Sequence, residues 1–315
     1  MIIQALYNYY QTLLEDSKSG ISPPGFSSAR ISHCLIVSKQ GQLINIVDLR
    51  DTQNNKLVSP RMIVPEQIKR SSGIAPNFIC DVCSYVLGLP QKGKEDKKGR
   101  ARECFRAYVS LQNSVLNNIE DEGARALLSF LNGWNPDVAE ENEIVLRYLD
   151  DITDGANLIF KLDGDKDYLH ECAPIIDAWK VYRSNQAAEY KCQCLVTGEE
   201  SNIAKLHHSI KGVTGAQSSG ASLVSFNQDA FTSYGKEQSY NAPVSEEVAF
   251  GYTTALNYLL SKTEYRVRVG DTTVVFWAEK STQGLEEDLI GALINPPQLE
   301  EENTNNKKKF IIYEG

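Results

Sequence analysis

The sequence predicts an α+β fold made of β-hairpins and short mixed sheets with an inserted helical region. Branched apolar residues at 31–37 and 43–49, separated by a polar turn with one glycine, indicate a β-hairpin. From about 76 to 151 the apolar residues instead recur at helical spacing. Hairpins and helices do not alternate as βαβ units, which favours α+β over a doubly wound parallel sheet.

Local patterns in the first half of the chain predict several helices and a further strand. Residues 1–16 carry an apolar face at three- and four-residue spacing, which predicts an amphipathic helix. A strand is expected at 56–64, where Pro60 indicates an edge strand or a bulge because proline cannot donate to a ladder. Within the helical region we expect helices near 78–87, 103–118, 121–132 and 137–150.

The second half of the chain is expected to contain both strands and helices. Residues 157–162 predict a strand that ends in the tight turn Asp163-Gly164. The remaining expected elements are a helix at 173–185, strands at 190–197 and 222–226, a helix at 245–261 with Ser245 as its N-cap, and a hairpin of 266–269 and 272–278.

The chain is long enough, with 315 residues of which 42% are apolar, to bury a core without disulfides or metals. We expect one large domain over 1–296 and then a polar linker or loop at 297–309. Residues 310–315, FIIYEG, read as the start of a truncated element, so we expect the chain to be part of a longer protein.

Composition and charge exclude several classes of protein. No apolar run approaches the roughly 18 residues of a membrane span, and the start of the chain lacks the features of a secretory signal. We therefore expect a cytoplasmic protein with no membrane partner, whose seven cysteines are reduced. The net charge of −9 argues against a freestanding nucleic-acid binder, but not against local basic loops within an assembly.

No pattern predicts a catalytic centre, a cofactor site or a metal site. The chain has no G-x-S-x-G motif, and its four histidines are scattered, so a serine hydrolase or nuclease is an alternative without specific support. Zinc is a second alternative, because Cys80 and Cys83 together with Cys192 and Cys194 would supply four thiolates. These pairs lie over a hundred residues apart, and we favour buried free thiols.

Three polar loops have the chemistry of nucleic-acid contacts. The block at 207–241 is rich in glycine, serine and amide side chains, which can approach phosphates or base edges closely. The stretch at 92–102 is basic, as phosphate-binding loops are. The segment at 69–77 reads as a rigid polar surface loop. For each loop the alternative is a plain turn or a solvated connector.

Several blocks carry a family resemblance that spans nearly the whole chain. They are IQALYNYYQTLLED, ISPPGFSSARISHCLIV, KRSSGIAPNFICDVCSYVLG, the long block from CLVTGEESN to YTTALNYLL, and VGDTTVVFWAE. In these blocks the chain resembles the N-terminal portion of the large subunit of the type I-C CRISPR surveillance complex (Cascade), of the Csd family. Members of that family finish with a C-terminal helical bundle, which the resemblance implies is absent from this chain.

The resemblance implies a non-enzymatic subunit in antiviral defence. Such a subunit recognises the protospacer-adjacent motif in duplex DNA, aids duplex opening and helps recruit a helicase-nuclease. The implied partners are the guide-handle-binding subunit, the backbone subunits, the CRISPR RNA and double-stranded target DNA, with base pairing reading the target itself. The alternative is a scaffold subunit that docks the guide-handle-binding subunit without reading DNA.

The resemblance also directs the choice of candidate residues. For motif reading they are Lys69, Arg70, Ser71, Ser72 and Asn77, then Lys211, Gln217, Ser218 and Ser219, and then Lys236, Gln238, Tyr240 and Asn241. Amide and amine side chains suit base edges, and Tyr240 would stack on or wedge between bases. For backbone phosphates the candidates are Lys92, Lys94, Lys97, Lys98, Arg100 and Arg102. No catalytic residue, cofactor or metal ligand is expected.

Overall fold

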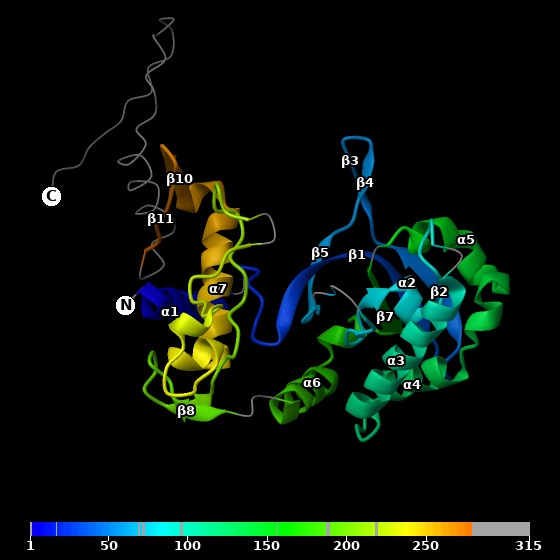
Figure 1. Ribbon diagram of the computed structural model, residues 1–315. Coiled ribbons are helices and arrows are strands. Elements are labelled where there is room, and N and C mark those ends of the chain that lie inside the picture. The colour runs from blue at the N-terminus through cyan, green and yellow to red at the C-terminus, as the bar shows by residue number, and fades with distance from the viewer. Residues whose placement is uncertain are drawn as a thin grey trace, which may run out of the picture. The chain divides into compact units, whose positions relative to one another are not determined.

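The computed structural model describes residues 2–278, apart from 17, 69, 71–72, 95–96, 156, 187–189 and 218–219 (Figure 1). The expected linker at 297–309 and truncated element at 310–315 lie outside this range. Where we expect one domain over 1–296, the contacts divide the chain into two compact units. The sheet unit comprises residues 17–194 and 198–203, and the terminal unit comprises the described parts of 1–16, 195–197 and 204–315.

A five-stranded mixed sheet lies at the centre of the sheet unit, and the long strand β1 (Phe26–Val37) runs through it. The first part of β1 pairs antiparallel with β5 (Arg61–Pro65), and its last part pairs antiparallel with β2 (Leu43–Asp48). On its other side β1 pairs in parallel with β7 (Asn157–Leu162), which pairs with the short strand β6 (Asp81–Val82). The expected hairpin and the expected strand at 157–162 are confirmed.

The helical region of the sheet unit lies between β6 and β7. Its elements are α2 (Cys83–Val86), α3 (Lys98–Leu116), α4 (Glu122–Gly133), the 3-10 helix η2 (Pro136–Glu141) and α5 (Glu143–Thr153). Side chains cap three of them: Asp121 accepts from the N–H of Ala124 at the start of α4, Asn135 accepts from the N–H of Asp137 at the start of η2, and Asn142 accepts from two N–H groups at the start of α5. In Figure 1 these helices gather at the end of the sheet that carries β2, where α4 packs on β1 and β7 and α5 packs on β2.

The expected helix at 78–87 is mostly wrong, because only its last part is helical. Asp81 and Val82 form the strand β6 instead, and the buried Ile79 has a φ of 57°, which no helix permits. The helical stretch is reduced to the single turn α2. Phe78, at the start of the expected helix, packs on α6 (Ala173–Gln186), which lies much later in the chain: the Trp179 ring stacks on Phe78 at 4.8 Å between centroids.

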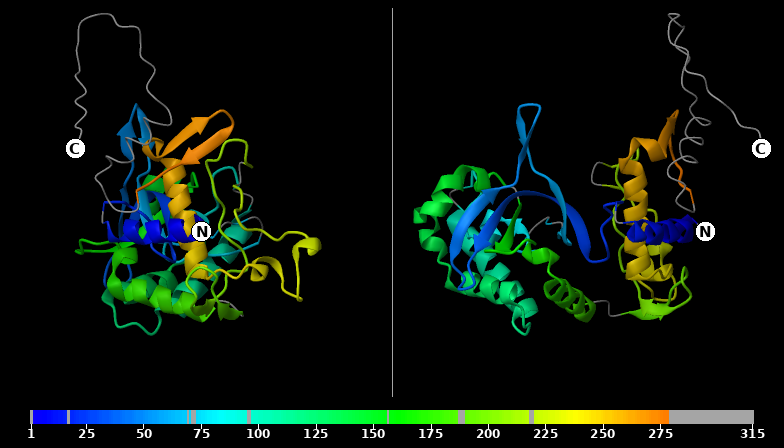
Figure 2. Two further views of the ribbon diagram at one scale, coloured as in Figure 1. Left: turned by 90° about the vertical axis from the view of Figure 1, so that its left-hand side faces the viewer. Right: turned by 180° about the vertical axis from the view of Figure 1, so that it is seen from behind.

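The expected strand at 56–64 is divided at Pro60 into β4 (Lys56–Val58) and β5. Proline has no N–H to donate, so the ladder is interrupted there. The first part pairs with β3 (Asp51–Gln53), a strand that the sequence pattern does not reveal, to form a two-stranded ribbon. Figures 1 and 2 show this ribbon projecting from the edge of the sheet, between the end of β2 and the start of β5.

In the terminal unit, the first helix α1 (Ile2–Glu15) packs against α7 (Glu246–Ser261), and both were expected. Ser245 caps α7 by accepting a hydrogen bond from the N–H of Val248 at 3.2 Å, as predicted. The helices approach closely at Gly251, where a Cβ atom would lie 2.7 Å from the ring of Tyr10. The expected last hairpin is present as β10 (Arg266–Val269) and β11 (Thr272–Val275).

Not every expected strand forms. Only β8 (Lys191–Gln193) represents the strand at 190–197, and it pairs with β9 (Glu200–Asn202). Residues 222–226 are not a strand: they are largely exposed, and the nearest pairing is the single bridge between Ile210 and Ala221. A strand needs a partner for its backbone groups, and no described strand pairs with this segment. The remaining short elements are the 3-10 helices η3 (Leu169–Glu171), η4 (Asp229–Phe231), η5 (Gln238–Asn241) and η6 (Thr263–Tyr265).

The predicted α+β class is therefore confirmed as a mixture of short sheets and several helices. The expected absence of a C-terminal helical bundle stays a prediction. Within the described residues, no helix has both the length and the apolar character that crossing a membrane requires.

Candidate nucleic-acid interface

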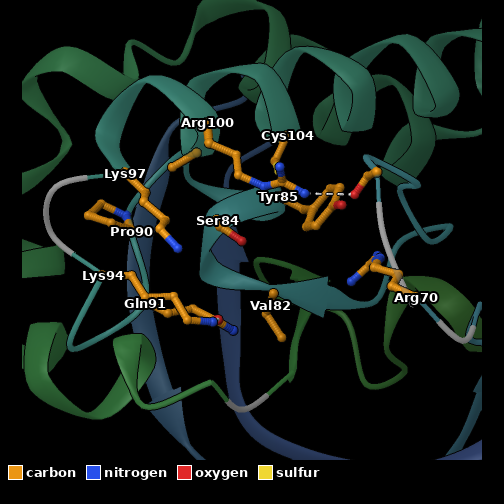
Figure 3. Close-up of a pocket in the computed structure, with 12 residues that line it drawn as sticks. Arg70, Val82, Ser84, Tyr85, Pro90, Gln91, Lys94, Lys97, Arg100 and Cys104 are labelled. Carbon is orange, nitrogen blue, oxygen red and sulfur yellow. Dashed lines mark hydrogen bonds between the residues drawn. The ribbon is translucent and has the colours of Figure 1, made fainter.

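An open cavity of about 530 Å³ lies in the sheet unit where the loop before β6 approaches the start of α3 (Figure 3). Four of the side chains that line it are cationic, and none of the described ones is acidic. Its described lining residues are Arg70, Gly73, Val82, Ser84, Tyr85, Pro90, Gln91, Lys94, Lys97, Arg100, Ala101 and Cys104. In Figure 3, Lys94 and Lys97 lie on one side and Arg70 on the opposite side, with Ser84 and Tyr85 between them.

Arg70 is held by an ion pair and by an aromatic ring. Its Nη1 donates to Oδ1 of Asp81 at 2.9 Å, and its Nη2 donates to the other oxygen of the same carboxylate. The guanidinium also lies 4.0 Å from the ring centroid of Tyr85, a cation–π contact. Asp81 is fully buried, and this burial raises the pKa of its carboxyl, while the guanidinium and the N–H groups of Asn77 and Val82 oppose that shift. Arg70 therefore forms a fixed part of the cavity wall, and the carboxylate of Asp81 largely compensates its positive charge.

Arg100 connects the two segments that approach each other at the cavity. Its Nη2 donates to the carbonyl oxygen of Gly73 at 2.9 Å, which connects the first turn of α3 to the loop before β6 (Figure 3). A carbonyl is a neutral acceptor, so the positive charge of Arg100 is not cancelled by this bond. The bond thus fixes the width of the opening and leaves a cation at its rim.

Lys94 and Lys97 contribute the remaining charge. The Nζ of Lys94 donates to Oε1 of Gln91 at 3.0 Å, again a neutral acceptor. Lys97 makes no ion pair with any residue that the structure describes. Together with Arg100 these side chains place around one cavity three cations that have no carboxylate partner among the described residues, an arrangement suited to a phosphate-bearing ligand.

A comparison with models of protein families identifies the family of this chain. The model of the family "CRISPR-associated protein (Cas_Csd1)" matches residues 6–313, almost the whole chain. The chain belongs to the Csd1 family. This result confirms the resemblance found in the sequence. A search of curated proteins finds no match.

The cavity of this Csd1 chain contains three of the six predicted phosphate-binding residues, namely Lys94, Lys97 and Arg100. The other three are paired with acidic side chains. The pairs are Lys92 with Asp150 at 3.7 Å, Lys98 with Glu140 at 2.9 Å and Arg102 with Asp137 at 2.5 Å. The sequence run is predominantly basic, but the fold places three of its cations beside carboxylates of α5 and η2.

The predicted motif-reading loop at 69–77 is divided as well. Lys69, Ser71 and Ser72 lie outside the described residues. Arg70 lines the cavity, whereas Asn77 is only 4% exposed. The side-chain Oδ1 of Asn77 accepts from the N–H of Ile68, and its Nδ2 donates to Gln67. Both ends of this amide are used within the fold, so Asn77 positions the loop and does not present itself to a ligand.

The other predicted readers belong to the terminal unit and do not line the cavity. Lys211 and Gln217 are exposed on the glycine-rich loop, whose backbone is fastened to α7 by Asn257. Ser218 and Ser219 lie outside the described residues. Asn241 holds the following loop together: its Oδ1 accepts from the N–H of Ser233, and its Nδ2 donates to two carbonyl groups, at 2.9 and 3.0 Å.

Lys236, Gln238 and Tyr240 are half-buried in the loop that Asn241 organises. The residue most available for stacking is one that sequence reasoning missed, Tyr234, which is 98% exposed. Its position before Gly235 in a glycine-rich loop is the sequence signal that would have indicated it. Tyr234 is thus more exposed than Tyr240, the tyrosine that the sequence analysis singles out.

The cysteines do not gather into a metal site among the described residues, where no group of three or more possible metal ligands is found. All seven are free thiols. Cys80 and Cys83 are buried, and burial raises the pKa of the Cys83 thiol to about 12, so this thiol stays protonated. The histidines at 33, 170 and 207 are buried as well, and burial lowers the pKa of each.

Proposed function

We propose that this Csd1 chain is a non-catalytic DNA-binding subunit of a type I-C CRISPR RNA-guided surveillance complex, and that its cavity holds the backbone of duplex DNA beside the protospacer-adjacent motif. One observation carries the proposal. Two loops that the sequence singles out separately, at 69–77 and at 92–102, line the same cavity, and the second places there three cations that pair with no carboxylate of the described residues. A chain with a net charge of −9 concentrates positive charge there, and phosphates are the anions that a CRISPR-associated subunit meets.

Phosphate contacts of this kind position a duplex without reading its sequence. The reading of a short flanking motif would come from side chains that reach base edges, and pairing with the CRISPR RNA would read the target itself. The further roles that we propose from family membership are duplex opening, docking against the guide-handle-binding and backbone subunits, and recruitment of the helicase-nuclease in the cytoplasm.

The decisive experiment compares variants in the reconstituted surveillance complex. The double substitution Lys94→Ala with Lys97→Ala removes two cations of the cavity, and Lys98→Ala is the matched control, because Lys98 adjoins the same loop but pairs with Glu140. Binding of a duplex with a matched target is measured at several salt concentrations. We expect the double variant to lose about tenfold in affinity and roughly 2 in the slope of log K against log salt. The control should stay within about twofold of the wild type.

The same experiment separates the scaffold alternative from the proposal. If the double variant assembles normally and keeps both the affinity and the salt slope, the cavity does not hold DNA and the subunit acts as a scaffold. If the wild-type complex hydrolyses the duplex or an ester substrate without the helicase-nuclease, the non-catalytic assignment is wrong.

A further inference from the structure

The ribbon of β3 and β4 stands apart from the core of the sheet unit. All residues from Asp51 to Leu57 are exposed, so neither face of the ribbon packs on the described part of the chain. An isolated two-stranded hairpin is marginal in water. Its geometry is nevertheless regular: the strands pair in register, and Asn54 and Asn55 have φ values of 49° and 61°, as both central residues of a type I′ turn do.

The tip of the ribbon carries four consecutive hydrogen-bonding side chains, Gln53, Asn54, Asn55 and Lys56. None of the four makes a side-chain hydrogen bond or an ion pair to a described residue. Amide side chains form paired hydrogen bonds with adenine, and lysine donates to the acceptors of guanine in the major groove. The tip therefore offers donors and acceptors of the kind that read base edges.

The root of the ribbon carries a second, independent feature. Arg30 of β1 and Arg61 of β5 lie directly opposite each other in the antiparallel register. Both are exposed, and neither has an ion pair with any part of the chain that the structure describes. Like charges directly opposite each other destabilise a sheet. A bound phosphate group would relieve this repulsion.

The dimensions agree with one kind of ligand. Three paired residues and a turn reach about 10 Å, at roughly 3.3 Å per residue. The major groove of B-form DNA is about 8.5 Å deep and wide enough to admit a two-stranded ribbon. A-form RNA has a major groove that side chains cannot enter, so an RNA duplex does not fit.

We propose that the ribbon enters the major groove of duplex DNA, with the side chains at 53–56 against base edges and with Arg30 and Arg61 on the flanking phosphates. This inference rests on the proposed function for the identity of the ligand, duplex DNA. It does not rest on the cavity, which is a separate set of residues. It assigns sequence reading to a segment that none of the predicted site residues includes.

The test uses the assembled complex and duplexes that carry a matched target with randomised flanking bases. The tip variant is Gln53→Ala with Lys56→Ala, which leaves the turn unchanged. The root variant is Arg61→Ala, and Asp51→Asn is the control on the same ribbon. We expect the tip variant to lose at least tenfold in preference between the best and the average flank, while the root variant weakens all flanks by a similar factor and lowers the salt slope by about 1.

Methylation of guanine N7 by dimethyl sulfate reports occupation of the major groove directly. The wild-type and control complexes should protect guanines in the flank, and the tip variant should lose this protection. Unchanged flank preference and protection in the tip variant would overturn the inference, as would loss of subunit assembly without DNA, which would make the ribbon a protein contact. Wild-type complexes that show no dependence on flank or salt would instead overturn the proposed function, and the inference with it.

Discussion

At the scale of single residues, the ion pair between Arg70 and Asp81 supports one side of the cavity. Its guanidinium is 23% exposed, and the carboxylate of Asp81 that it grips is fully buried. A buried carboxylate that loses its cation is costly, because the protein interior cannot solvate the charge that remains. The pair therefore stabilises the loop before β6 only as a pair, and the cavity depends on it.

This dependence predicts the effect of Arg70→Gln. The substitution leaves the fully buried carboxylate of Asp81 without its cation. We expect the free energy of unfolding to fall by about 3 kcal/mol, as for other buried pairs that lose one partner. Urea denaturation followed by circular dichroism measures the change.

The control is Arg102→Gln, which breaks a pair with Asp137 whose side chains are 42% and 60% exposed. Exposed pairs contribute less than about 1 kcal/mol, so this variant should differ little from the wild type. Equal losses in the two variants would show that Asp81 has no special role in the loop.

At the scale of elements, the close approach of α1 and α7 depends on the absence of one side chain. Gly251 faces the rings of Tyr7 and Tyr10, and a Cβ atom would lie 2.8 and 2.7 Å from them. Real Cβ contacts are longer, so the helices would have to separate or the rings to move.

We therefore expect Gly251→Ala to destabilise the chain by about 1–3 kcal/mol, although alanine is the better helix former by about 1 kcal/mol. The matched control is Gly133→Ala in α4, where a Cβ atom would meet nothing within 4 Å. There the helix propensity acts alone, and stability should stay the same or rise. Thermal unfolding of both variants decides between these outcomes, and a stabilising Gly251→Ala would contradict the packing argument.

At the scale of the whole molecule, each unit contains a buried histidine that is neutral in the folded state. His170 in the sheet unit finds no hydrogen-bond partner for either ring nitrogen among the described residues, and burial lowers its pKa to about 4. His207 in the terminal unit lies 2.8 Å from the hydroxyl of Tyr252, and burial again lowers its pKa to about 4. In the unfolded chain both would titrate near pH 6.5.

The sign of the pH dependence follows from these directions. Between pH 6.5 and 4 the unfolded chain binds more protons than the folded one, so stability is complete above pH 6.5 and is lost as the pH falls. At pH 5 we expect a loss of roughly 2 kcal/mol for each histidine. Denaturant midpoints at pH 7.5 and pH 5 measure it. His170→Phe keeps an aromatic ring beside Tyr168 and should reduce the pH dependence; the same pH dependence in this variant and the wild type would rule His170 out.

Features that depend on local patterns could be predicted from the sequence alone. Helices with an apolar face and a capping side chain, such as α7 with Ser245, form where their own residues predict them. The hairpin of β1 and β2 and the family membership were accessible in the same way, since both are properties of contiguous residues. The basic character of the loop at 92–102 is likewise evident from its residues.

Which of these residues lie together becomes visible only in the folded chain. It turned Lys98 and Arg102 toward carboxylates, buried Asn77 as a structural amide, and left Lys94 and Lys97 beside Arg100 around a cavity. It also revealed the ribbon of β3 and β4, because β3 has no apolar pattern of its own and is defined by its partner strand. Pairing, burial and charge compensation arise from residues distant in the sequence, and a linear pattern therefore does not contain them.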